Sequence, residues 1–110
     1  MATETTARFL QDYPPFIYLP KIDLEELAGQ AIREEVAEGG FLFEEGGEVQ
    51  PFIYVLRKGH FEIMKKFEDS TQVIDVLKKG DVLGARAILT HKPYLASARA
   101  TRKSVLIKIP

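Results

Sequence analysis

The first thirty residues show the apolar spacing of short helices. Residues 5–12 predict one helix, which ends before Pro14 and Pro15 because proline breaks a helix and restricts the residue before it. Residues 23–30 predict a second helix with one inward apolar face. The expected inward and anchoring residues of this region are Phe9, Leu10, Phe16, Ile17, Leu24, Leu27 and Ala28. Residues 1–30 are therefore interpreted as a helical lead.

The start of the second helix carries a capping pattern. Asp23 is a good acceptor at a helix start, and Glu26 follows three residues later. In a capping box these two side chains satisfy backbone N–H groups of the first turn. The pattern predicts a helix that begins at Asp23.

Beyond residue 30 the periodicity changes to short apolar runs separated by glycine, proline or charged pairs. Phe61 and Ile63 alternate with Glu62 and Met64, which is typical of a strand with one buried face. The other runs are 32–36, 41–43, 52–56, 73–77, 94–100 and 105–107. Several short strands at such spacing predict an all-β sandwich or barrel. Residues 31–110 are expected to form a mainly β, antiparallel β-roll or jelly-roll barrel.

One segment breaks this rhythm. Residues 83–90 have helical composition and stand between two strand runs. A barrel needs no helix at this point, so the insertion is where a binding function is expected. Gly84 at its start would leave backbone N–H groups open to an anion.

Composition and charge narrow the class of protein. A chain of 110 residues fits one domain. Its 15 basic and 16 acidic residues give a net charge of −1, which offers no whole-molecule attraction to nucleic acid. The chain has no cysteine, so disulfides and thiolate metal sites are excluded. It shows no signal-peptide pattern and no apolar run near the ~20 residues of a membrane span, so a cytoplasmic protein without membrane contact is expected.

Candidate catalytic and metal-binding residues are few. The two histidines, His60 and His91, lie next to turn residues and have no second ligand at metal spacing. Thr90, Ser97 and Ser104 lack the context of a nucleophile elbow. We therefore expect no metal site, no cofactor and no enzymatic activity.

Four fragments in order resemble the cyclic-nucleotide-binding domain family, the β-roll sensor of bacterial catabolite activators and cyclic-nucleotide-dependent kinases. They are GFLFEEG (40–46), YVLRKG (54–59), GDVLG (80–84) and PYLASARA (93–100). Each fragment alone is weak, but their order and spacing fit the family over about residues 9–110. The resemblance implies a regulatory module in signal transduction, with no catalysis of its own.

A narrower similarity concerns one bacterial group. It is carried by residues 9–16, 92–100 and 106–110. In that group a domain of this kind precedes paired CBS domains and a nucleotidyltransferase-like domain. The similarity implies that the chain is the N-terminal module of a longer protein and reports to downstream domains.

The resemblance also implies a ligand site. In the family a Gly-Glu turn, a short helix and an arginine on the next strand hold the ribose and the cyclic phosphate. Gly84 keeps the glycine, but Ala85 stands at the glutamate position and Tyr94 at the arginine position. Ser97 falls where the family often has threonine or serine near the base. The expected ligand-binding residues are Leu83, Gly84, Ala85, Arg86, Ala87, Ile88, Tyr94, Leu95 and Ser97.

The two missing side chains change the expected ligand. Each lost charge-assisted bond costs about 1.5–3 kcal/mol, so binding of cAMP or cGMP is expected to weaken by roughly two orders of magnitude. Two alternatives stay open. The chain is either a sensor of a small nucleotide-like ligand or anion, which Arg86 could approach, or a ligand-free scaffold for protein interaction or homodimerisation. In the second case the ring of Tyr94 would fill the vacated pocket, on the strand that also carries Arg99 on its opposite face.

Overall fold

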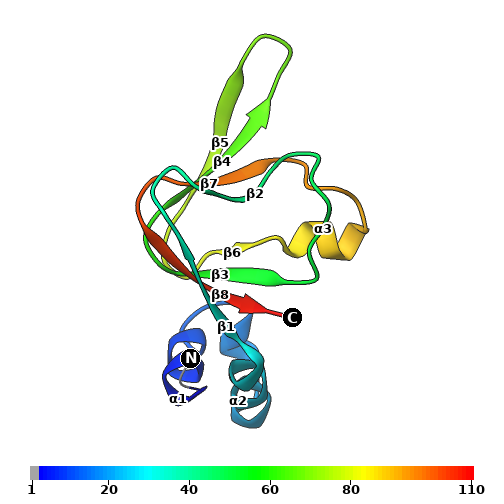
Figure 1. The fold of residues 1–110 in the computed structure, drawn as a ribbon. Coiled ribbons are helices and arrows are strands. Elements are labelled where there is room, and N and C mark those ends of the chain that lie inside the picture. The colour runs from blue at the N-terminus through cyan, green and yellow to red at the C-terminus, as the bar shows by residue number, and fades with distance from the viewer. Residues whose placement is uncertain (1–2) are drawn as a thin grey trace.

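The structure is a computed structural model that describes residues 3–110, and it places a two-sheet β-roll on a pair of N-terminal helices (Figure 1). The helical elements are α1 (Thr3–Leu10), η1 (Phe16–Tyr18), α2 (Lys21–Gln30) and α3 (Ala85–Thr90). The strands are β1 (Ile32–Val36), β2 (Phe41–Phe43), β3 (Ile53–Lys58), β4 (Phe61–Lys66), β5 (Thr71–Leu77), β6 (Val82–Leu83), β7 (Ser97–Ala100) and β8 (Ser104–Ile109). The mainly β antiparallel roll is confirmed.

Two four-stranded sheets form the roll. Sheet A has the strand order β1-β8-β3-β6, and sheet B has the order β2-β7-β4-β5. Their inner faces enclose one core cluster, in which Leu56, Phe61 and Leu106 are fully buried. The β4–β5 hairpin extends beyond the roll, and α3 lies at the end opposite the turns that follow β3 and β7 (Figure 1).

The helical lead packs against the outer face of sheet A. Phe9, Leu10 and Phe16 are buried there against Val55 and Ile107 of the sheet. Of the described anchors, Ile17 is half exposed, so its prediction as an anchor is wrong. A single 3₁₀ turn directs only part of its side chains inward, and in η1 that position belongs to Phe16. Residues 1 and 2 of the predicted lead lie outside the described residues.

The predicted capping box is wrong. The second helix begins at Lys21, with Pro20 at its N-cap and no side-chain cap. The N–H of Leu24 donates to the carbonyl of Pro20 at 3.0 Å. Asp23 therefore lies inside the first turn, where its carboxylate faces the positive end of the helix dipole but does not cap it.

The predicted strand 94–100 is too long at its start, because β7 begins at Ser97. Tyr94 lies in the preceding loop, where its N–H donates to the carbonyl of Gly47 and its carbonyl accepts from the N–H of Gly46. Arg99 lies on β7 and donates from Nε to the carbonyl of Gly39 at 3.4 Å. Strand alternation therefore does not relate Tyr94 to Arg99.

The turn between β3 and β4 requires glycine at position 59. Gly59 has a φ of 107°, and a Cβ there would lie 2.7 Å from the Cα of Ser104. We expect Gly59→Ala to lower the free energy of unfolding by about 2 kcal/mol, from left-handed strain and the backbone clash together. Gly46→Ala is the control: its φ is 79° but nothing lies within 4 Å, so it should cost about 1 kcal/mol. Urea denaturation measures both, and equal losses would contradict the role of the clash.

Candidate functional site

The short helix α3 interrupts the roll between β6 and β7, as the sequence predicts. Gly84 at its N-cap has a φ of 83°, which glycine adopts without the steric cost of a side chain. A Cβ at this position would lie 3.4 Å from the ring of Tyr54. Gly84 thus lets the chain pass close over a buried aromatic ring and enter the helix.

A cavity of about 480 Å³ lies between α3 and the β4–β5 hairpin. Its volume falls within the range of small-molecule sites. Its apolar lining residues are Phe43, Ile63, Ile74, Leu77, Val82, Leu83, Ala87, Pro93, Tyr94, Leu95 and Ala96. Four side chains bring polar or charged groups to it: Lys65, Asp75, Arg86 and Thr90. We call this space the α3 cavity.

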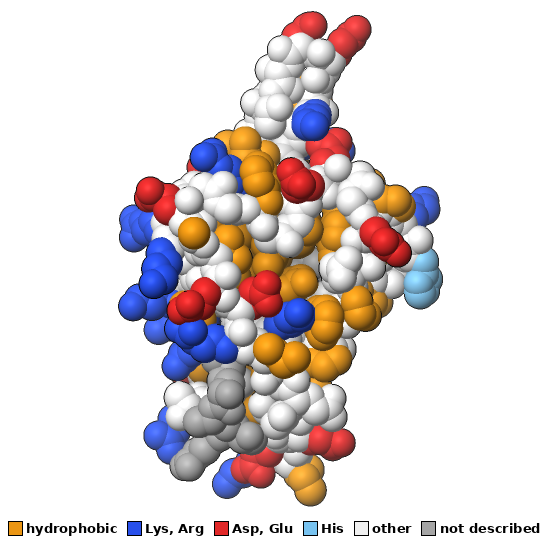
Figure 2. Space-filling model, in the orientation of Figure 1, with side chains coloured by type: hydrophobic (Ala, Val, Ile, Leu, Met, Phe, Trp, Pro, Cys, Tyr) orange, Lys and Arg blue, Asp and Glu red, His pale blue; other side chains and the backbone are white. Residues whose placement is uncertain are grey.

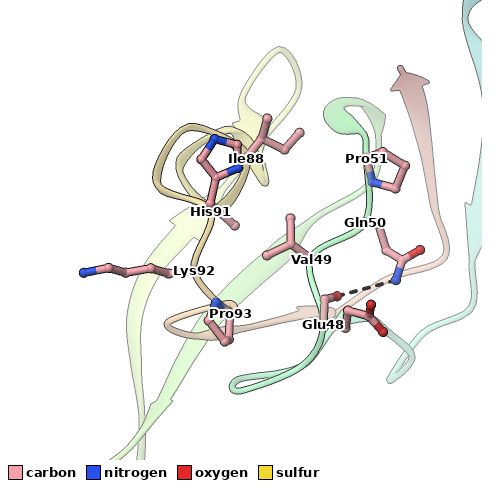
Figure 3. A pocket seen from close by; sticks show the side chains of 9 residues that line it. Glu48, Val49, Gln50, Pro51, Ile88, His91, Lys92 and Pro93 are labelled. Carbon is pink, nitrogen blue, oxygen red and sulfur yellow. Dashed lines mark hydrogen bonds between the residues drawn. The ribbon is translucent and has the colours of Figure 1, made fainter.

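The structure brings six of the nine expected ligand-binding residues to the α3 cavity. They are Leu83, Gly84, Arg86, Ala87, Tyr94 and Leu95. Ile88 lines a separate cleft of about 500 Å³ between α3 and residues 48–51, which Val49, Pro51 and Pro93 also line (Figure 3). Ala85 lies outside both linings. Ser97 also lies outside the α3 cavity, and its Oγ accepts from the N–H of Glu45 at 2.8 Å.

The sequence analysis did not predict that residues of β4 and β5 line the cavity. Lys65 and Asp75 bring a cation and a carboxylate to the lining. The period-two pattern of β4 held the necessary signal, since Lys65 is two residues from Ile63 and shares its inward face. No comparable signal exists in β5, because a register irregularity opposite Ile63 places both Ile74 and Asp75 at the cavity.

Tyr94 forms a wall of the cavity and leaves it open. Its side chain is only 4% exposed and stacks on Phe43, with ring centroids 4.0 Å apart and planes 8° from parallel. Its hydroxyl accepts a hydrogen bond from the N–H of Gln50 at 3.1 Å. Groups of the protein itself therefore contact both the ring face and the hydroxyl of Tyr94.

A neighbouring tyrosine, Tyr54, lies next to Gly84 but outside the lining of the α3 cavity. Tyr54 is buried beneath Gly84. Burial raises the pKa of its hydroxyl, and the proximity of Tyr94 and Glu34 adds to the rise. The charged side chains of the α3 cavity are Lys65, Asp75 and Arg86, which we call its charged rim.

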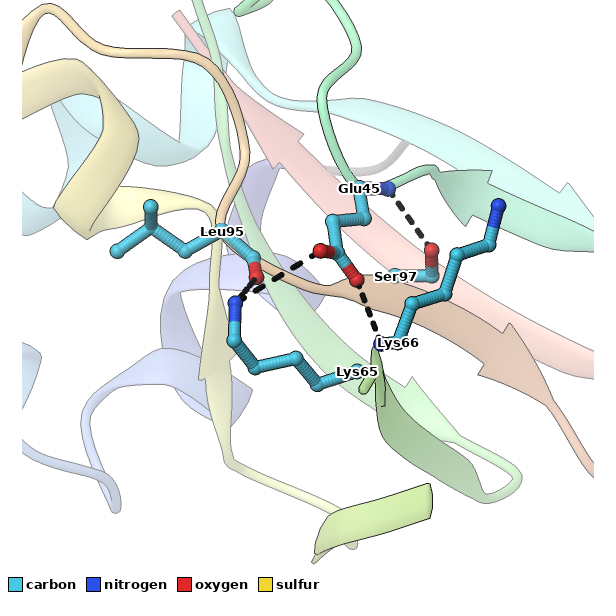
Figure 4. A network of polar contacts seen from close by, with 5 residues as sticks. All are labelled: Glu45, Lys65, Lys66, Leu95 and Ser97. Carbon is cyan, nitrogen blue, oxygen red and sulfur yellow. Dashed lines mark hydrogen bonds and ion pairs between the residues drawn. The ribbon is translucent and has the colours of Figure 1, made fainter. Parts of the chain in front are cut away.

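A polar network holds Lys65 at that rim (Figure 4). Its Nζ donates to the carbonyl of Leu95 at 2.6 Å and lies 3.7 Å from Oε2 of Glu45. The other oxygen of Glu45 accepts from the N–H of Lys66 at 2.8 Å. Lys65 is thereby positioned and partly neutralised, whereas Arg86 is exposed on α3. Arg86 is the cation better placed to approach an incoming anion.

The described residues hold neither a cluster of metal ligands nor a helix that could span a membrane. Within residues 3–110 no group of three or more His, Asp or Glu side chains is arranged to hold a metal ion. None of the helices in that part of the chain is long and apolar enough to cross a membrane.

Several solved structures share the fold of this chain. The regulatory subunit of a cAMP-independent protein kinase A from Trypanosoma cruzi, solved with guanosine bound, superposes with a TM-score of 0.91 at 23% identity, over 97% of this chain and 38% of that one. The regulatory domain of Toxoplasma gondii PKA, co-crystallised with cAMP, gives 0.87 at 22% identity, over 96% and 40%. The sensor domain of the transcriptional regulator DNR from Pseudomonas aeruginosa gives 0.85 at 22% identity, over 97% and 72%.

These structures are too distant in sequence to show more than the fold, and this chain spans less than half the length of the two kinase proteins. The comparison with curated proteins gave no match. The family model described as the cyclic nucleotide-binding domain, however, matches residues 33–110, which is most of the chain. The chain belongs to the cyclic nucleotide-binding domain family.

Proposed function

We propose that this chain is a regulatory module that senses a small nucleoside- or nucleotide-like ligand in the α3 cavity. One observation carries the proposal: a cavity of about 480 Å³ lies open beside Tyr94, the residue that the resemblance assigns to the arginine position. Because Tyr94 packs on Phe43, its ring lies along the wall. The structural relatives solved with guanosine and with cAMP are consistent with a purine nucleoside as the common part of the ligand.

The lining favours the nucleoside over the cyclic phosphate. Most of the α3 cavity is apolar, which suits the faces of a base and a ribose. The hydroxyl of Tyr94 and the ammonium of Lys65 already have partners in the protein, so they add little to phosphate binding. Arg86 remains as the exposed cation of the lining. Weak binding of cAMP and cGMP stays a prediction of this proposal.

Binding in this place would regulate and not catalyse. The cavity joins α3 to the β4–β5 hairpin, so a ligand that contacts both would bias how these elements pack. Downstream domains, including the CBS pair and the nucleotidyltransferase-like domain of the narrower similarity, are proposed recipients of that change. A homodimer and a cytoplasmic location belong to the same proposal.

The proposal predicts ligand-dependent stabilisation. Adenosine, guanosine, cAMP, cGMP and inorganic phosphate are added separately, and the melting temperature is measured by differential scanning fluorimetry. A ligand at 100 times its Kd should add ~2.7 kcal/mol to the free energy of unfolding. At least one purine nucleoside or nucleotide should raise the melting temperature, and phosphate alone should not.

Three variants test whether the stabilisation by a ligand arises from binding in the α3 cavity. Ala96 lines the α3 cavity and Ala37 is exposed elsewhere, so Ala96→Leu should remove the ligand effect and Ala37→Leu should preserve it. Arg86→Gln should weaken the binding of nucleotides by about tenfold or more, the value of one charge-assisted bond, and leave the binding of nucleosides unchanged. Equal ligand effects in the two alanine variants would contradict binding in this cavity.

One set of observations favours the ligand-free scaffold as the second candidate. Tyr94 is fully engaged within the protein, and sheet B presents exposed apolar side chains on β2 and β5, namely Phe41, Val73 and Val76. Unchanged melting temperatures with every purine tested would favour this candidate. Sedimentation at increasing protein concentration would then show whether the exposed sheet face joins two copies.

A further inference from the structure

A further hollow, separate from the α3 cavity and from the cleft beside Ile88, lies on the other side of the roll from α3. Its volume is about 540 Å³, and it lies at the end of β3, where Lys58 pairs with Val105 of β8. Its lining residues are Arg33, Arg57, Lys58, Gly59, Lys79 and Val105. In the described part of the chain, four of these six are cationic and none is acidic. We call this site the basic hollow.

The cations come from separate elements that the fold brings together. Arg33 lies on β1, Arg57 and Lys58 end β3, and Lys79 lies in the turn between β5 and β6. Lys58 pairs in register with Val105, which places its strand end at the floor of the hollow. Figure 2 shows Lys and Arg side chains gathered on this side of the roll, where the turns after β3, β5 and β7 lie. This concentration contrasts with a net charge of −1 for the whole chain.

A buried aromatic ring holds two of these cations in place. The guanidinium carbon of Arg57 lies 4.4 Å from the ring centroid of Phe9, and Nζ of Lys79 lies 5.9 Å from it. Phe9 is only 7% exposed, so the ring is fixed by the core of the helical lead. Cation–π contact thus keeps two like charges side by side at the hollow.

The acidic groups nearby leave most of this charge available. Arg33 forms an ion pair with Glu35 at 2.8 Å, but both side chains are about half exposed, so solvent screens the pair. The carboxylate of Asp81 accepts from the backbone N–H of Lys78 in the adjoining turn at 2.9 Å. Neither Glu35 nor Asp81 belongs to the lining.

From this geometry we infer that the basic hollow binds a small polyanion with two or more linked phosphate groups. Converging cations that repel one another gain from a ligand that carries several negative charges. Arginine offers a planar fork to phosphate oxygens, and lysine offers a mobile point charge. A single-stranded nucleic acid is less suited, because such sites stack bases on exposed aromatic rings and Phe9 is buried beneath the cations.

The test uses inorganic tripolyphosphate and ATP as probes, measured by isothermal titration calorimetry at low salt. Both should bind the unchanged protein if linked phosphates suffice, and tripolyphosphate alone would identify an inorganic chain as the ligand. Lys58→Gln with Lys79→Gln should weaken binding by about tenfold or more. Arg102→Gln with Lys103→Gln removes the same charge from exposed positions outside the lining, and should change binding by less than about threefold. Glu35→Gln should strengthen binding by about twofold, because it removes the competing carboxylate.

Backbone NMR locates the site independently of affinity. The amides of Gly59 and Val105 should shift on addition of tripolyphosphate, and those of Gly84 and Ala87 should not. If the double variant inside the hollow and the double variant outside it lose the same affinity for tripolyphosphate, the attraction is unspecific and the inference is overturned. Loss of tripolyphosphate binding only in Arg86→Gln would overturn it in favour of the α3 cavity, and the absence of any binding would overturn it outright. Tighter binding of a single-stranded oligonucleotide that needs the same lysines would replace the small anion by nucleic acid.

Discussion

Phe61→Ala is expected to lower the free energy of unfolding by about 3–5 kcal/mol. Phe61 is the largest fully buried side chain of the described residues, with 0% exposure. It stands in register with Leu77 on β5 and with Ala100 on β7, so its ring fills the space beside a small residue. Removal of the ring leaves a void that its neighbours, held on the strands on either side of β4, close only in part.

The loss should be large against the total stability of the domain. Small domains unfold at a cost of about 5–15 kcal/mol, so this substitution would remove a large share of it. The melting temperature should fall by more than about 10 °C, and urea denaturation followed by circular dichroism gives the free energy directly. Leu77, the β5 partner of Phe61, also lines the α3 cavity. The same variant should therefore weaken the binding of any purine that stabilises the unchanged protein.

Phe67→Ala provides the matched control. Phe67 follows β4 at the hairpin tip and is 47% exposed, so the same atoms are removed from a place that water already reaches. Its loss should change the free energy of unfolding by less than about 0.5 kcal/mol. A similar loss in both variants, or a loss below about 1 kcal/mol for Phe61→Ala, would mean that sheet B does not pack on sheet A as described.

The architecture of the roll was predictable because its signals are local. Apolar runs of strand length alternate with turns that contain glycine, and in these turns Gly39, Gly46, Gly59 and Gly80 adopt positive φ whereas Gly40 does not. The helix after Gly84 was also predictable, since its composition differs from the runs on either side. These features depend on neighbouring residues, so one sequence suffices to find them.

The details of the site were less predictable because they depend on contacts between distant segments. Tyr94 lies outside the strand because its backbone N–H donates to the carbonyl of Gly47. The hydrophobic periodicity does not reveal such a contact. Ser97 likewise lies outside the α3 cavity, and its Oγ accepts from the N–H of Glu45, 52 residues away in the chain. Asp23 failed as a cap because Pro20 already begins the helix. In each case a long-range or backbone interaction replaced the role that the side chain alone suggested.

Ala85→Glu combined with Tyr94→Arg is expected to raise the affinity for cAMP by roughly two orders of magnitude, about 2.7 kcal/mol. The resemblance to the family places a glutamate for the ribose hydroxyl and an arginine for the cyclic phosphate at these two positions. Each restored charge-assisted bond contributes about 1.5–3 kcal/mol. Part of that gain is offset, because the arginine substitution removes the ring stacked on Phe43 and the acceptor for the N–H of Gln50. Titration calorimetry with cAMP measures the net effect.

The controls separate phosphate recognition from a general opening of the cavity. Tyr94→Phe keeps the stack on Phe43 and removes only the hydroxyl, so it should leave cAMP binding within about threefold of the unchanged protein. Adenosine lacks the phosphate, so the double variant should raise the affinity for cAMP far more than the affinity for adenosine. A folded double variant that binds both equally would show that Tyr94 excludes the ligand by volume alone. A folded double variant without any gain for cAMP would show that α3 and the loop around residue 94 do not converge on one ligand, and the sensor proposal would then give way to the scaffold.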